Sequence, residues 1–170
     1  MRIDIYNKKK ITLGILCALC CLSVAVMIFT AIKTINDKET ITPPAFDSTA
    51  VMGTPDVPEN LGYSPLEVEQ GYKAYVCGEL LATGSNVDVY FTSPKTNEVW
   101  LLLRVTDETG AVLGETGLIC PGEYVKTLTL NTMPDKEIRV KLKIIAYLPE
   151  TYTSMGVVGL NTKLKIYGQE

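Results

Sequence analysis

The stretch from Ile138 to Tyr147, IRVKLKIIAY, indicates most clearly how this chain folds. Apolar residues occupy every second position through Ala146, and cations fill the first three positions between them. Because successive side chains of a strand point to opposite faces, this alternation predicts a strand with one buried and one solvated face. Residues 157–166 repeat the pattern. The cations on the two polar faces are Arg139, Lys141, Lys143, Lys163 and Lys165.

Similar short alternations, separated by turn residues, fill the chain from residue 71 to residue 170. They predict an all-β fold, a seven-stranded immunoglobulin-like β-sandwich. The strand around VWLLLRV is apolar on both faces at first, so it should be central, with Trp100 and Leu102 covered by a loop or a partner. The expected strands are residues 72–80, 86–92, 99–107, 111–116, 124–130, 138–147 and 157–166.

Two loop sequences carry a resemblance. SPKTN at residues 93–97 and GLICPGE at residues 117–123 flank a hairpin that turns at Gly110. This arrangement resembles the immunoglobulin-like and fibronectin-like sandwiches of bacterial membrane-anchored envelope proteins. The resemblance is architectural. It implies a scaffold that hosts adhesion, spacing or accessory roles, and it transfers no functional residue to this chain.

The N-terminal part predicts a membrane anchor. Residues 11–32, ITLGILCALCCLSVAVMIFTAI, form an uncharged apolar run long enough for a transmembrane helix. The leader, residues 1–10, carries four cations against one acid, which predicts a cytoplasmic N-terminus and an extracytoplasmic domain at residues 71–170. A cleaved signal peptide and lipidation at Cys17 or Cys20 are the alternatives. Residues 33–70 are rich in Pro and acids and predict a stalk.

Two cysteines lie beyond the apolar run, Cys77 and Cys120. In an extracytoplasmic domain they either form a disulfide or remain free packed thiols. The alternation of the first expected strand turns Cys77 outward. Two cysteines without any His do not make an ordinary zinc site, so we expect no metal and no cofactor.

Two features are candidates for partner binding. The first is the set of five cations, which would share one face if their strands pair. It suits an anionic envelope polymer, a lipid headgroup or an acidic protein, or it merely keeps a sheet edge from aggregating. The second is the loop at residues 149–156, in which Tyr152 and Met155, with the preceding Tyr147, either form a contact surface or cap the end of the sandwich.

The composition narrows the function classes. The chain contains no His, which excludes His-dependent catalysis, and its net charge of −3 gives no support to nucleic-acid binding. We therefore expect a non-enzymatic binding or structural accessory module, held in the membrane of a bacterial-type cell envelope. Its partners would be the membrane and another envelope protein or an anionic polymer. The alternatives are a carboxylate-dependent envelope hydrolase and a subunit of a membrane complex assembled through the transmembrane helix.

Overall fold

The computed structural model describes residues 20, 22–24, 27, 43–68 and 71–167. The chain divides into two compact units, residues 1–42 and residues 43–170. The described residues of the first unit are helical. Within the described part of the chain, no helix is both long and apolar enough to cross a membrane. The predicted leader and most of the predicted transmembrane helix lie outside the described residues.

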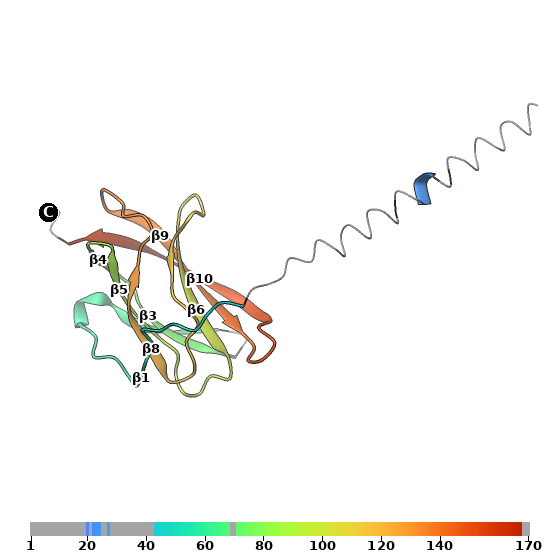
Figure 1. Ribbon diagram of the computed structural model, residues 1–170. Coiled ribbons are helices and arrows are strands. Elements are labelled where there is room, and N and C mark those ends of the chain that lie inside the picture. Colours follow the sequence, from blue (N-terminus) through green and yellow to red (C-terminus); the bar gives the residue numbers. More distant parts are fainter. Residues whose placement is uncertain (1–19, 21, 25–26, 28–42, 69–70, 168–170) are drawn as a thin grey trace, which may run out of the picture. The chain divides into compact units, whose positions relative to one another are not determined.

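The second unit is all-β, as predicted, and forms a curled sheet (Figure 1). All seven expected strands are present, and residues 86–92 and 138–147 have the expected bounds. Three further strands, β1, β2 and β4, and a short 3-10 helix at Glu59–Leu61 were not expected. Among the described residues the strands are β1 (Val51–Met52), β2 (Tyr63–Glu67), β3 (Lys73–Cys77), β4 (Leu80–Thr83), β5 (Asn86–Thr92), β6 (Trp100–Asp107), β7 (Val112–Glu115), β8 (Glu123–Thr129), β9 (Ile138–Tyr147) and β10 (Ser154–Ile166).

The strands form one hydrogen-bonded sheet, whereas the immunoglobulin-like prediction calls for two separate sheets. The order is β1-β8-β5-β4-β10-β9-β6-β7, with β3 paired to β5 and β2 paired to β3. The two halves are joined where β10 pairs in parallel with β4. A bulge between Asp88 and Phe91, with Tyr90 at a φ of 46°, lets β5 leave β4 and pair with β3.

The far edge of the sheet returns close to its beginning. The Asn131 amide donates to the Leu113 carbonyl at 2.7 Å, which places β7 beside the end of β8. Gly114 allows this approach, because a Cβ there would stand 2.7 Å from both the Leu128 side chain and the Thr129 carbonyl. The curled sheet therefore encloses its core from nearly all sides.

The core forms where the inward faces of the two halves meet. On β9 the fully buried Leu142 and Ile144 point inward, as the alternation predicts, and they share one cluster with Val87 and Phe91 from β5. Burying apolar surface contributes about 25 cal/mol per Å², so this cluster supplies the main favourable term for the fold.

Residues 43–68 belong to the folded unit, which corrects the predicted boundary at Gly71. The Asp47 carboxylate accepts the Gly117 amide at 2.8 Å, while the Asp47 amide donates to the Leu118 carbonyl at 2.9 Å. Further along, β1 pairs with β8 and β2 pairs with β3. These segments are short, and β2 contains Pro65, so they leave no clear periodic pattern in the sequence, and the Pro content suggested a stalk.

Candidate basic binding face

The pairing of β9 with β10 brings the predicted cations together. Arg139 lies directly opposite Lys163, Lys141 lies opposite Asn161, and Lys143 lies opposite Gly159. Directly paired residues share a face of the sheet. Arg139, Lys141 and Lys163 are exposed, so this shared face points outward. Lys165 follows Lys163 on the same side of β10. We call this surface, made of Arg139, Lys141, Lys143, Lys163 and Lys165, the basic face.

The cations of the basic face differ in their ion pairs. Lys163 contacts Glu137 at 2.9 Å, and Lys165 contacts Glu79 at 2.6 Å. Arg139, Lys141 and Lys143 have no carboxylate within ion-pair distance among the described residues. Three neighbouring positive charges on one strand are thus left without an opposite charge in this part of the chain.

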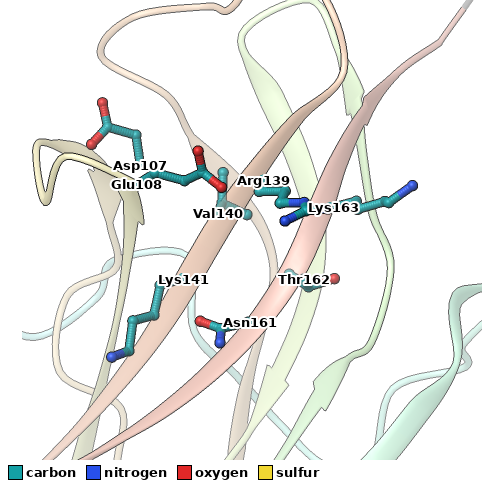
Figure 2. Close-up of a pocket in the computed structure, with 8 residues that line it drawn as sticks. All are labelled: Asp107, Glu108, Arg139, Val140, Lys141, Asn161, Thr162 and Lys163. Atoms are coloured by element: carbon teal, nitrogen blue, oxygen red, sulfur yellow. The ribbon is translucent and has the colours of Figure 1, made fainter.

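A depression of about 540 Å³ opens over the basic face. Figure 2 shows Arg139 and Lys163 extending together on one side of it, with Asn161 and Thr162 below them. Glu108, in the turn that joins β6 to β7, points toward β9 from the opposite side. The floor and one wall of the depression are therefore basic and hydrogen-bonding, while the other wall carries carboxylates.

The Asp107 carboxylate is held within its own turn. It accepts the Thr109 amide at 2.9 Å, the Thr109 hydroxyl at 2.7 Å and the Ala111 amide at 2.9 Å. These hydrogen bonds, that from the Thr109 hydroxyl first, lower the pKa of Asp107 below its usual value. Asp107 therefore remains ionised near neutral pH and suits turn formation better than proton donation.

The loop after β9 packs onto an outer apolar cluster. The ring centroid of Tyr152 lies 5.2 Å from that of Trp100, and the ring centroid of Phe46 lies 4.8 Å from that of Trp100. Leu102 of this cluster is 2% exposed, so the expectation that a loop covers it is confirmed, whereas Trp100 is covered only in part. Tyr147 packs against the same cluster, whereas Met155 is exposed. Partner contact by Tyr147, Tyr152 and Met155 stays a prediction.

Cys77 and Cys120 are free thiols in the structure. Cys77 is fully buried in the main core, which corrects the prediction that it faces outward. Burial, reinforced by the charge of Asp88, raises the pKa of Cys77 to about 12, so the thiol stays protonated and unreactive. Burial, followed by the neighbouring Glu123, also raises the pKa of Cys120. Within the described part of the chain, no three His, Cys, Asp or Glu side chains come together as a metal site.

Sequence reasoning missed several residues of this surface. Asn161 and Thr162 line the depression because of the register between β9 and β10. Glu108 lines it because the turn between β6 and β7 lies beside β9. Arg104 stands directly opposite Lys143, paired with Glu115 at 2.7 Å. Knowing that β9 lies between β6 and β10 would have identified them, but a single sequence does not give strand order.

The comparisons with known proteins add little. No protein-family model and no curated protein matches the chain. One solved structure, CopC from Methylosinus trichosporium OB3b, is similar with a TM-score of 0.32 and 12% sequence identity. The match covers 61% of this chain and 92% of that one. A similarity this distant does not identify a family.

Proposed function

We propose that this protein is a membrane-anchored, extracytoplasmic binding module of a bacterial-type cell envelope. Its basic face holds an acidic protein or an anionic envelope polymer close to the membrane. The observation that carries the proposal is the row of Arg139, Lys141 and Lys143, which have no ion-pair partner among the described residues. Arg139 and Lys141 also line the depression. Like charges held side by side raise the local potential and favour an anionic partner.

The position of the folded unit restricts where such a partner would be held. If residues 11–32 form the anchor, residues 33–42 alone separate it from the unit that starts at Pro43. At most about 3.6 Å per residue, this linker would reach no further than roughly 36 Å. Pro43, where the folded unit starts, would then stay within roughly 36 Å of the end of the anchor, so a partner bound by the unit would be held near the membrane.

The chemistry of the carboxylates supports binding over hydrolysis. A glycosidase needs one carboxyl group with a raised pKa as a general acid. The pKa of Asp107 is lowered by its turn hydrogen bonds, and that of Glu137 is lowered by Lys163. Neither group suits the proton-donating role. Assembly through the apolar segment is the other alternative, and exchange of that segment for an unrelated anchor tests it.

A matched pair of charge reversals tests the proposal. Lys141 and Lys73 are both exposed strand lysines, but Lys73 lies on β3 in the other half of the sheet and pairs with Glu67 at 2.7 Å. The full chain, reconstituted in neutral lipid, is titrated with polyglutamate and with a phosphate-bearing glycopolymer. We expect Lys141→Glu to weaken binding at least about fivefold and Lys73→Glu to leave it nearly unchanged. The unaltered chain should bind more weakly at high salt, because salt screens the charges. Equal effects of the two substitutions, or no binding by the unaltered chain, would refute the proposal.

A further inference from the structure

One side of β10 is an open sheet edge. β10 pairs with β9 from Ser154 to Leu164, but it pairs with β4 only from Leu164 to Ile166. No other described strand lies alongside its earlier residues. Val157 is 55% exposed, and Gly159 and Asn161 are also exposed.

The direction of the backbone groups at this edge follows from the end of the strand. The Tyr167 amide donates to the Ala82 carbonyl, so odd-numbered residues of β10 direct their amide and carbonyl groups toward β4. Because the direction alternates with a period of two, the odd-numbered residues Val157, Gly159 and Asn161 present theirs on the same side, beyond the reach of β4. The Thr162 hydroxyl donates to the Gly78 carbonyl, which marks where the open part of the edge ends.

The other edges of the described sheet are less suited to pairing with a strand. β1 has two residues, β2 contains Pro65, and the four-residue β7 is held beside the end of β8. Proline and shortness are common protections of sheet edges. The open part of β10 has neither, and its inward residues Val158 and Leu160 are only partly buried against the core.

The Lys141 side chain reaches from β9 to lie over Gly159 of β10. A Cβ built on Gly159 would stand 2.5 Å from Lys141 Cε and 3.3 Å from its Nζ, so the missing side chain of Gly159 makes room for the lysine. Strands pair about 4.8 Å apart. A carboxylate on the outward side of a strand added opposite Gly159 would therefore lie within reach of the Lys141 ammonium.

We propose that the open edge of β10, from Val157 to Asn161, binds an extended acidic segment of a partner protein by β-strand addition. The backbone groups of β10 supply the hydrogen bonds, and Lys141, backed by Arg139 and Lys143, selects acidic residues at alternate positions of the added strand. Apolar residues at the positions between would cover Val158 and Leu160. This inference rests on the proposed function of the basic face and specifies the partner.

A proline substitution at Asn161 tests the inference. The probe is a short synthetic peptide that alternates Val and Glu, titrated into the full chain. Asn161→Pro removes an amide that faces the open edge and leaves the bonds to β9 intact, whereas Asn161→Ala keeps the amide. We expect Asn161→Pro to weaken binding about tenfold or more and Asn161→Ala to change it less than about twofold. Thermal melting of both variants, within a few degrees of the unaltered chain, verifies that they fold.

The outcomes separate this inference from the proposed function. Loss of peptide binding in Lys141→Glu together with full binding by Asn161→Pro would overturn strand addition and leave the basic face as the site. Equal binding of the Val-Glu peptide and a Val-Lys peptide would overturn the acidic selection. Self-association of the unaltered chain that disappears in Asn161→Pro, without peptide binding, would assign the edge to a second copy and overturn the proposed partner.

Discussion

Truncation of Leu142 to Ala tests the strand register on which the basic face depends. Leu142 is fully buried in the main core, and its neighbour Lys141 points out of the opposite face. Removing a buried Leu side chain costs the transfer energy of the lost atoms and leaves a cavity, about 3–4 kcal/mol in total. A domain of this size has a stability of about 5–15 kcal/mol, so the loss would be a large part of it.

Thermal and urea unfolding of the full chain measure this effect. A loss of about 3–4 kcal/mol should lower the melting temperature by roughly 10–15 °C and the urea midpoint by about 1–2 M. Lys141→Ala is the matched control, and we expect it to change the stability by less than about 0.5 kcal/mol. Similar destabilisation by the two substitutions would refute the reasoning, because a one-residue slip exchanges the two faces of a strand.

Three further predictions concern Asn97, Tyr72 and the two cysteines of the folded unit. Asn97→Ala should lower the free energy of unfolding by about 3 kcal/mol in urea. The reason is that the Asn97 side chain accepts the Lys73 amide at 2.9 Å and donates to the Lys73 carbonyl at 2.7 Å. A change below about 1 kcal/mol would contradict this bridging role. Tyr72→Phe should leave the stability unchanged or raise it by up to about 1 kcal/mol in the same assay, because the buried Tyr72 hydroxyl has no hydrogen-bond partner among the described residues. A clear loss of stability would contradict this. Thiol alkylation at pH 8, read by mass spectrometry, should modify Cys120 well before Cys77, whose pKa is raised to about 12 by burial; equal rates would mean that the core opens.

Strand positions were predictable because the side-chain period of two is a local property. The alternation around Leu142 gave the bounds of β9 and its inward face correctly. It failed at Cys77, which is buried although it lies opposite in phase to Val76. There the chain around Leu61 belongs to the same core cluster, and hydrogen bonds hold Gly62 beside Gly78. Such coverage depends on contacts between distant segments, which local periodicity does not encode.

The candidate site was predictable in composition but not in geometry. The sequence placed five cations on polar faces and proposed that they gather if β9 and β10 pair, which the register confirms. It did not reveal that Lys163 and Lys165 are paired with acids, while Lys141 has no acid within ion-pair distance in the described part of the chain. It also gave no sign of the open edge of β10, because an edge is defined by the strand that is missing beside it.

Mapping of backbone amide signals by NMR during titration with an acidic peptide tests the central claim most directly. If the basic face is the binding surface, the largest chemical-shift changes will fall on residues 139–143 of β9 and 157–163 of β10, and they will diminish in Lys141→Glu. Residues 63–67 and 73–77, on β2 and β3 in the other half of the sheet, will change little. Shifts concentrated on β2 and β3, or on the loop around Tyr152 alone, would contradict the account.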